Sequence, residues 1–157
     1  MESKNLKLIL IVTNIPNPYR IPLFNELNKQ LNAQGMALKV VFAAKGYARR
    51  MFNLDMNDCK FDYQILNSPT YTAGDNVEKT YFSYKGLLKV VAKEKPYRII
   101  IGGYSPGTVA LWLRSFIQPT PFIIWSGTLI KKGRNDSWWR VLERKTITKR
   151  AKALVVY

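Results

Sequence analysis

Histidine is absent from this 157-residue chain, and cysteine occurs only once, at Cys59. A single cysteine excludes a disulfide within the chain. The lack of histidine excludes Cys/His zinc sites and every catalytic triad that relies on a histidine base. This pattern favours a reducing compartment, and we expect Cys59 to have no chemical role.

Acidic residues are also scarce, with 10 Asp and Glu against 25 Lys and Arg, which gives a formal net charge of +15. Asp55, Asp58 and Asp62 lie near one another in the sequence. They form neither a D-x-D metal motif nor a pair of acids at strand ends, so we expect them on a solvated surface. The sequence therefore predicts no metal site and no cofactor, and it leaves the catalytic residues unknown.

Long apolar runs are missing as well, since no stretch approaches the roughly 18 apolar residues that a membrane-spanning helix needs. The apolar run at residues 8–12 follows Lys7 and is followed by Asn14, Ile15 and Pro16. This is not the small-residue cleavage site of a signal peptide, so the run predicts a buried strand. Apolar residues make up 47% of the chain, which is enough for the core of one globular domain, either soluble or bound to a surface.

Short apolar runs rich in Ile, Val and Leu recur along the chain. Because they are continuous rather than alternating, they predict strands covered on both faces, as in a parallel sheet. They lie at residues 6–13, 37–44, 98–101, 121–125 and 153–157, with a weaker candidate at 63–66. Helical patterns fill the gaps at residues 19–33, 83–93, 105–117 and 137–150. The alternation predicts an α/β, three-layer, Rossmann-like doubly wound fold with a mainly parallel sheet and helices on both faces.

Two of these helices carry more detailed expectations. Four apolar residues of the helix at 19–33 share one face and are expected to pack on the sheet: Leu23, Phe24, Leu27 and Leu31. The helix at 105–117 opens with Ser105 as N-cap and Pro106, and it is expected to be buried on most sides. Residues 45–60 have a weak pattern and predict a loop or an irregular helix.

The loops after the strands are the candidate functional segments, because ligands of doubly wound sheets bind beyond the carboxyl ends of the strands. In one of them, Gly102 and Gly107 have the separation of a phosphate-binding loop, but no lysine precedes Thr108. This excludes a nucleoside-triphosphate loop. Its backbone amides suit an anion or a sugar hydroxyl. Alternatively, Gly102 and Gly103 only form a tight turn and Pro106 only starts a helix.

Basic residues gather toward the end of the chain, where residues 131–152 hold nine Lys and Arg and two acids, a local excess of +7. Trp138 and Trp139 lie among them, and indoles interleaved with cations suit an anionic membrane interface as well as nucleic acid phosphates. A solvated helix with its tryptophans in the core is the simpler alternative. The residues expected to bind the membrane are Lys131, Lys132, Arg134, Trp138, Trp139, Arg140 and Arg144.

Four segments at the predicted strand ends carry a family resemblance. They are Asn14 to Arg20 leading into Leu23, Phe24 and Asn25, then Ile100 to Thr108, then Ile124 to Gly127, and finally Trp139 and Arg140 leading to the last strand. In this order and spacing they resemble the N-terminal half of a family 4 glycosyltransferase of the GT-B fold. The resemblance covers nearly the whole chain. It implies that residues 1–157 form one Rossmann-like domain that recognises the acceptor, with the donor-binding half absent.

The activity implied by the resemblance is that of a retaining glycosyltransferase of the hexosyltransferase type. The full-length enzyme would transfer a sugar from a nucleotide-sugar to a glycan or lipid-linked acceptor, in polysaccharide or glycolipid synthesis and without a metal. Positioning and stabilisation of the leaving diphosphate would do most of the work. The implied partners are the acceptor, a nucleotide-sugar held by the missing C-terminal domain, and an anionic membrane, with no nucleic acid. The implied location is cytoplasmic, peripheral at the inner face of the membrane, and the fragment alone is expected to be inactive.

Acceptor recognition is expected in loops at one edge of the sheet, because Tyr and Arg suit sugar rings and anionic groups. The expected residues are Asn17, Tyr19, Arg20, Gly103, Tyr104, Ser105 and Ser126. The chain departs from the family in its first loop, where Ile15 and Pro16 replace a glycine pair that members often carry. It also lacks the histidine that many members place near the donor sugar.

Two other functions stay open. One is a basic single-domain module that binds nucleic acid or another polyanion, although the chain shows no known RNA- or DNA-binding signature. The other is a complete small α/β enzyme of unrelated type, which the lack of histidine and of an acid-base pair disfavours. A reading frame that continues past Tyr157 into a second α/β unit would favour the glycosyltransferase.

Overall fold

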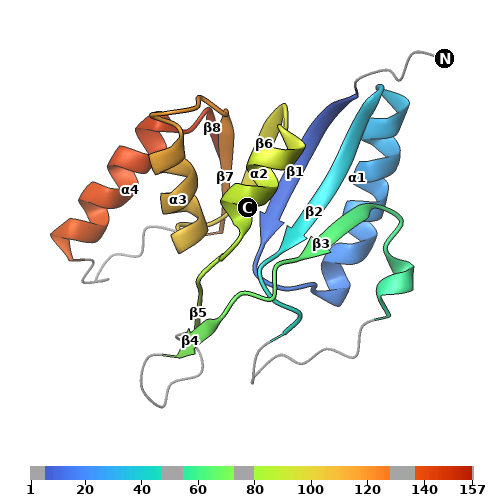
Figure 1. Cartoon of the computed structure of the whole chain (residues 1–157), viewed down its shortest axis with the longest axis horizontal. Coiled ribbons are helices and arrows are strands. Elements are labelled where there is room, and N and C mark those ends of the chain that lie inside the picture. Colours follow the sequence, from blue (N-terminus) through green and yellow to red (C-terminus); the bar gives the residue numbers. More distant parts are fainter. Residues whose placement is uncertain (1–5, 47–54, 73–79, 128–136, 157) are drawn as a thin grey trace.

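The computed structural model describes residues 6–46, 55–72, 80–127 and 137–156. Within these residues the chain forms a six-stranded sheet in the order β3-β2-β1-β6-β7-β8, in which all neighbouring strands are parallel (Figure 1). The strands are β1 (Lys7–Thr13), β2 (Met36–Phe42), β3 (Asp62–Ile65), β6 (Arg98–Gly102), β7 (Phe122–Ser126) and β8 (Ala153–Val156). Each corresponds to a predicted apolar run, and the predicted α/β Rossmann-like fold with a parallel sheet is confirmed.

Helices lie on both faces of this sheet and build the three predicted layers. Helix α1 (Ile21–Ala33) packs on one face, where Ile21 and Phe24 join Ile11 and Val40 in a buried cluster. Three helices pack on the other face, over a larger cluster that includes Leu111. They are α2 (Leu87–Glu94), α3 (Pro106–Arg114) and α4 (Trp138–Arg150). The two buried clusters therefore lie on opposite faces of the central strands.

The inward face of α1 differs from the predicted one at a single position. Phe24 is 1% exposed as expected, but Leu23 is 51% exposed and Ile21 takes the buried place instead. A 3-10 turn at Pro18–Arg20 precedes the helix, and it sets the phase in which Ile21, Phe24 and Leu31 face the sheet. Leu23 lies about 100° away from Phe24 around the helix and therefore points toward solvent.

The prediction that the helix at 105–117 is buried on most sides holds for most of α3 but not for the residues after it. Thr108 and Leu111 are buried, whereas Phe116 and Ile117 are 58% and 85% exposed. The helix ends at Arg114, and the backbone turns that follow, such as Ile117 N–H to the Arg114 carbonyl at 2.9 Å, carry these apolar residues beyond the sheet. Phe116 there meets the edge of the Trp112 ring, with centroids 5.3 Å apart, and the Arg150 guanidinium, 4.5 Å from its centroid.

Helix α2 begins at Leu87, four residues later than predicted, because the backbone before it is not helical. Tyr84 and Gly86 have φ angles of 54° and 94°, in the left-handed region. A short antiparallel hairpin, which the sequence analysis missed, precedes this turn. It consists of β4 (Thr70–Thr72) and β5 (Thr80–Phe82). In the weakly patterned stretch 45–60, the structure shows a 3-10 turn at Met56–Asp58, and residues 47–54 lie outside the described part.

Lys39 in the middle of β2 joins three elements through its partly buried ammonium group. Its side chain is 13% exposed, and its Nζ lies 3.0 Å from Asp62 of β3 and 3.1 Å from Glu94 of α2. Burial alone lowers the pKa of Lys39. Its hydrogen bonds and charge interactions with the two carboxylates outweigh burial and raise the pKa above its ordinary value.

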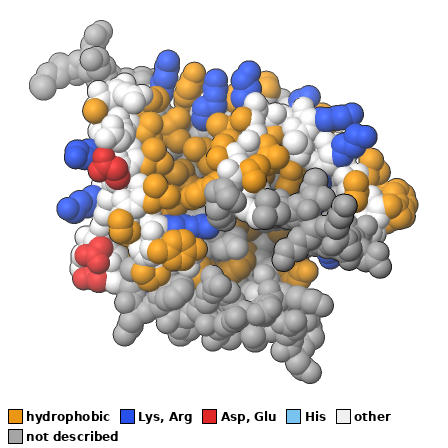
Figure 2. Space-filling view, turned by 180° about the vertical axis from the view of Figure 1, so that it is seen from behind, with side chains coloured by type: hydrophobic (Ala, Val, Ile, Leu, Met, Phe, Trp, Pro, Cys, Tyr) orange, Lys and Arg blue, Asp and Glu red, His pale blue; other side chains and the backbone are white. Residues whose placement is uncertain are grey.

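The face that carries α1 is only partly covered among the described residues. Helix α1 packs over Ile11 and Val40 of the central strands, whereas Val155 at the edge strand β8 is 47% exposed. Seen from behind, hydrophobic side chains gather in the middle of the molecule, with Lys and Arg along its upper rim (Figure 2). In the described ranges, no helix is long and apolar enough to cross a membrane.

Candidate functional site

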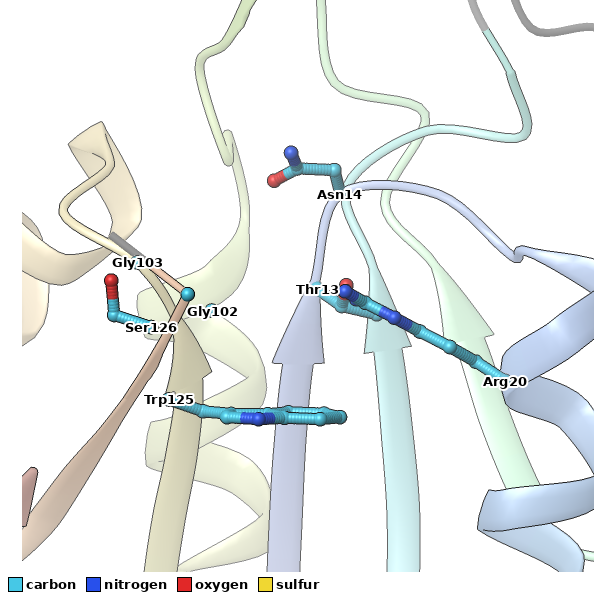
Figure 3. Close-up of a pocket in the computed structure, with 8 residues that line it drawn as sticks. Thr13, Asn14, Arg20, Gly102, Gly103, Trp125 and Ser126 are labelled. Atoms are coloured by element: carbon cyan, nitrogen blue, oxygen red, sulfur yellow. The ribbon is translucent and has the colours of Figure 1, made fainter. Parts of the chain in front are cut away.

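A pocket of about 360 Å³ opens at the carboxyl ends of the central strands (Figure 3). The chain passes from β1 to β2 on one side, while β6 and β7 lie on the other side of β1. The pocket therefore lies at the topological switch point, where open α/β sheets bind their ligands. Its size suits a sugar ring or a similar small group. It is lined by Thr13, Asn14, Arg20, Gly102, Gly103, Trp125, Ser126 and Gly127.

Arg20 is the charged residue of this lining. The backbone carbonyl of Asn17 accepts from the Arg20 N–H at 2.9 Å, which fixes the turn that leads into α1. Arg20 Nη1 donates to Thr13 Oγ1 at 3.0 Å, and the guanidinium lies 5.0 Å from the ring centroid of Trp125. Among the described residues, no carboxylate lies within 4.0 Å of this guanidinium.

Trp125 connects the pocket to the core. It lies near the end of β7, and its ring meets Phe24 of α1 edge-on, with centroids 6.5 Å apart and planes at 73°. Figure 3 shows the ring edge-on at one side of the pocket, with the Arg20 side chain reaching toward Thr13 above it. An aromatic ring held on two sides in this way is a fixed platform for the guanidinium.

Asn14 is oriented by a residue 70 positions away in the sequence, Tyr84. The Tyr84 hydroxyl donates to Asn14 Oδ1. Tyr84 is 4% exposed, and burial raises its pKa to about 12, so the hydroxyl keeps its proton at any ordinary pH. Its ring packs on Gly107, where an added Cβ would lie 2.9 to 3.1 Å from ring atoms. Tyr84, packed against Gly107, therefore supports the Asn14 side chain at the wall of the pocket.

The loop from Gly102 to Thr108 forms a tight turn and a helix start, which both interpretations of this loop require. Gly103 has a φ of 66°, a conformation that favours glycine. Ser105 caps α3, since its hydroxyl accepts from the Thr108 N–H at 3.3 Å, and the Thr108 hydroxyl donates to the Gly103 carbonyl at 2.7 Å. These bonds hold the turn in place, and the loop contributes Gly102 and Gly103 to the lining of the pocket.

The predicted acceptor-binding residues are divided between the pocket and its surroundings. Arg20, Gly103 and Ser126 line it. Tyr104 and Ser105, with Gly103, line an adjoining hollow of about 240 Å³. Asn17 is 6% exposed and Tyr19 is 66% exposed, and neither lines any of these hollows.

The predicted acceptor-binding set left out five residues that line the pocket, and it also left out Tyr84 behind Asn14. The five are Thr13, Asn14, Gly102, Trp125 and Gly127. Thr13 and Trp125 lie in the last positions of predicted strands, and Asn14 is the first residue after a strand, so the strand-end rule could have found them. No local signal marks Tyr84, because its contact with Asn14 depends on the tertiary fold.

Three hollows follow one another along the carboxyl edge of the sheet. The adjoining hollow shares Asn14 and Gly103 with the pocket, and it shares Tyr104 and Ser105 with a third hollow of about 570 Å³. The third hollow reaches α4, whose residues Arg140, Glu143 and Arg144 line it. The three hollows together connect Arg20 to α4.

The predicted membrane-binding residues on α4 lie at the surface. Trp138 and Trp139 are 63% and 62% exposed, and their rings stack with centroids 3.8 Å apart. The alternative that places these tryptophans in the core is therefore wrong. Arg144 lies over the Tyr104 ring at 5.6 Å. The other three predicted residues, Lys131, Lys132 and Arg134, lie outside the described residues.

Cys59 and the acidic residues offer little reactive chemistry. Burial, with the nearby carboxylates of Asp58 and Asp55, raises the pKa of the Cys59 thiol and lowers its reactivity. In the described part of the chain, no three His, Cys, Asp or Glu side chains are grouped so that they could hold a metal ion.

Comparisons with known proteins show the fold. No protein family matches the chain, and no curated protein matches it. Among solved structures, it is similar to a protein from Listeria monocytogenes assigned as a UDP-N-acetylglucosamine 2-epimerase, with a TM-score of 0.58 and 16% sequence identity. The match covers 95% of this chain and 38% of the other, so the chain spans less than half of that protein's length. The likeness supports a GT-B-like Rossmann fold and does not extend to membership of glycosyltransferase family 4.

Proposed function

We propose that this chain is the acceptor-binding domain of a retaining glycosyltransferase, which transfers a sugar from a nucleotide-sugar to a glycan or lipid-linked acceptor. The observation that carries the proposal is the pocket at the switch point, which joins Arg20, Trp125 and the Gly102 loop at the carboxyl edge of the sheet. The GT-B-like fold and the segments that resemble family 4 support it.

In this proposal the nucleotide-sugar is held by a second domain, and this chain orients the acceptor. Orienting two reactants can contribute several kcal/mol to a transfer reaction. Trp125 holds the Arg20 guanidinium over its ring at the wall of the pocket, and Ser126, which is 5% exposed, lies beside it in the lining. Tyr104 lies in the next hollow, where a longer glycan would continue.

Calorimetry and a transfer assay on the 157-residue chain test whether this chain binds the acceptor and not the nucleotide-sugar. We expect no micromolar binding of a nucleoside-diphosphate sugar and no turnover, because transfer requires the leaving diphosphate to be held. In the full-length protein, Arg20→Ala and Tyr104→Ala should impair transfer with little change in melting temperature. Turnover by the chain alone, or conversion of UDP-N-acetylglucosamine to its C2 epimer, would contradict the proposal.

A second proposal concerns location: the protein is peripheral at the inner, cytoplasmic face of the membrane, and α4 makes the contact. Trp138, Trp139 and Leu142 are exposed on this helix. Of the described residues from 97 to 156, eight are Lys or Arg and one is acidic, Glu143. Exposed indoles next to cations match the chemistry of an anionic lipid surface.

The polyanion-binding alternative is less well supported. Its basis was the excess of cations in residues 131–152, whereas the exposed apolar side chains of Trp138, Trp139 and Leu142 are unsuited to a purely electrostatic contact with phosphates. A binding competition between RNA and anionic vesicles distinguishes the two, since only lipid should shift the tryptophan emission to the blue.

A further inference from the structure

We infer that the pocket at the switch point recognises a negatively charged group on the acceptor, a phosphate or a carboxylate, through the Arg20 guanidinium and the Asn14 amide. The inference rests on the proposed function and narrows the class of acceptor. Both side chains have free N–H donors, and none of the residues that line the pocket is acidic.

Arg20 has more donors than the protein uses. A guanidinium carries five N–H donors in one plane, and Arg20 gives one of them to Thr13 Oγ1. The described residues place no carboxylate within 4.0 Å of it, and none of the eight lining residues is acidic. A partly buried arginine without a counter-ion at a pocket wall is the arrangement that binds carboxylate and phosphate groups.

Two aromatic rings hold the Arg20 guanidinium in place. Its central carbon lies 5.0 Å from the Trp125 ring centroid and 5.6 Å from that of Tyr19. Interaction with the ring faces leaves the N–H groups at the edge of the guanidinium available for an anion. The bond to Thr13, which is 3% exposed, further restricts the side chain. The guanidinium is therefore ordered before a ligand arrives, which reduces the entropy lost on binding.

Asn14 supplies a second donor in a fixed orientation. Because Oδ1 accepts from the buried Tyr84 hydroxyl, the Nδ2 end of the amide is left with two N–H donors. Among the described residues, Nδ2 makes no hydrogen bond, and Asn14 lines both the pocket and the adjoining hollow. The Tyr84 hydroxyl stays protonated up to a pH of about 12, so this orientation persists at any working pH. Tyr84 is thus a positioning residue for Asn14.

Titration of the 157-residue chain with three matched sugars tests the inference: glucose, glucose 6-phosphate and glucuronate. We expect at least one charged sugar to bind about tenfold more tightly than glucose, as one or two charge-assisted hydrogen bonds imply. The affinities of glucose 6-phosphate and glucuronate, compared with each other, show whether the pocket prefers a phosphate or a carboxylate. Inorganic phosphate, titrated alone, shows how much of the affinity the anion contributes without the ring.

Three variants assign the effect to the pocket. Arg20→Gln should abolish the preference for the charged sugar, whereas Arg98→Gln, which removes the same charge at the amino end of the sheet, should leave it intact. Arg98 is a suitable control because it contacts its neighbour Tyr97 and no pocket residue. Tyr84→Phe keeps the ring on Gly107 and removes only the hydroxyl, so it should weaken charged-sugar binding several-fold with little change in melting temperature.

Four results of these titrations would contradict the inference or a part of it. If glucose binds as tightly as the charged sugars, the inference fails while the proposed acceptor domain stands. If Arg20→Gln and Arg98→Gln weaken charged-sugar binding equally, the inference is also overturned, because binding would then depend on the net charge of the protein and not on the pocket. Unchanged binding in Tyr84→Phe overturns the role of Asn14 and Tyr84. If no sugar binds and the full-length protein transfers none, the proposed function fails as well.

Discussion

The Arg20 guanidinium lies 5.0 Å from the ring centroid of Trp125, so a residue of the turn before α1 is tied to the end of β7. Trp125 in turn meets Phe24 of α1. The three side chains form a row from the core to the pocket, in which the innermost is buried and the outermost is charged. A change at Phe24 or Trp125 is therefore expected to reach the pocket through Arg20.

Thr13→Val tests how far Arg20 depends on its hydrogen bond. The substitution keeps the volume of this 3% exposed side chain and removes the acceptor of Arg20 Nη1. We expect the unfolding free energy to fall by about 1 kcal/mol and binding of the preferred charged sugar to weaken, because the guanidinium loses an anchor. Urea unfolding and calorimetry measure the two effects. Unchanged affinity would show that the aromatic contacts alone position Arg20.

Gly107→Ala tests the packing of Tyr84. A Cβ at this position meets the Tyr84 ring at 2.9 to 3.1 Å, and the ring is buried and cannot move freely. We expect a loss of about 1–3 kcal/mol in urea unfolding, as for other overpacked cores. The double variant Gly107→Ala with Tyr84→Leu should recover part of this loss, since a smaller side chain makes room. Strict additivity of the two changes would contradict the proposed contact.

Lys39→Met tests the partly buried ammonium that joins β2, β3 and α2. The pKa of Lys39 is raised above its ordinary value of 10.5 in the folded protein. A raised pKa means that the charged form stabilises the fold fully below pH 10.5, and that this stability is lost as the pH rises through the folded pKa. At neutral pH we expect the variant to be less stable by about 1–2 kcal/mol. The difference from the unmodified protein should narrow above pH 10.5, and a constant difference would contradict the assignment.

Substitution of both Trp138 and Trp139 by Ala tests the membrane proposal. Anionic vesicles should bind the unmodified chain, with a blue shift of tryptophan emission and a steep loss of binding as salt rises. The variant should bind more weakly at the same net charge. Tyr71→Ala is a matched control, because Tyr71 is also an exposed aromatic residue, 61% accessible, and lies on β4 rather than on α4. Equal binding of all three proteins would place the membrane contact elsewhere.

Much of the fold was predictable because β1, β2, β6 and β7 are nearly continuous apolar runs, interrupted in β2 by Lys39, a pattern typical of buried parallel strands. Which face of each helix packs on the sheet was harder to predict. Leu23 fits the apolar stripe of α1 as well as Ile21 does, and only the preceding turn decides between them. The hairpin of β4 and β5 has three residues in each strand, too few for a periodic pattern to show.

The candidate site was predictable only where strand ends reveal it. Arg20, Gly103 and Ser126 follow or end predicted strands, and the structure brings them to one pocket. The pairing of Tyr84 with Asn14 spans 70 residues and depends on a left-handed residue that no local rule assigns to tyrosine. Positioning contacts of this kind arise from tertiary structure, whereas strand-end residues follow from the order of the elements.

The central place of β1 also affects how the chain is made. Leu10 of β1 pairs in register with Ile99 of β6, so one side of the first strand has no partner until about 90 further residues have been synthesised. At about 5–20 residues per second, a ribosome takes several seconds to deliver them. During that time the nascent chain exposes an apolar strand edge, which makes it a candidate client for chaperones that bind extended apolar segments.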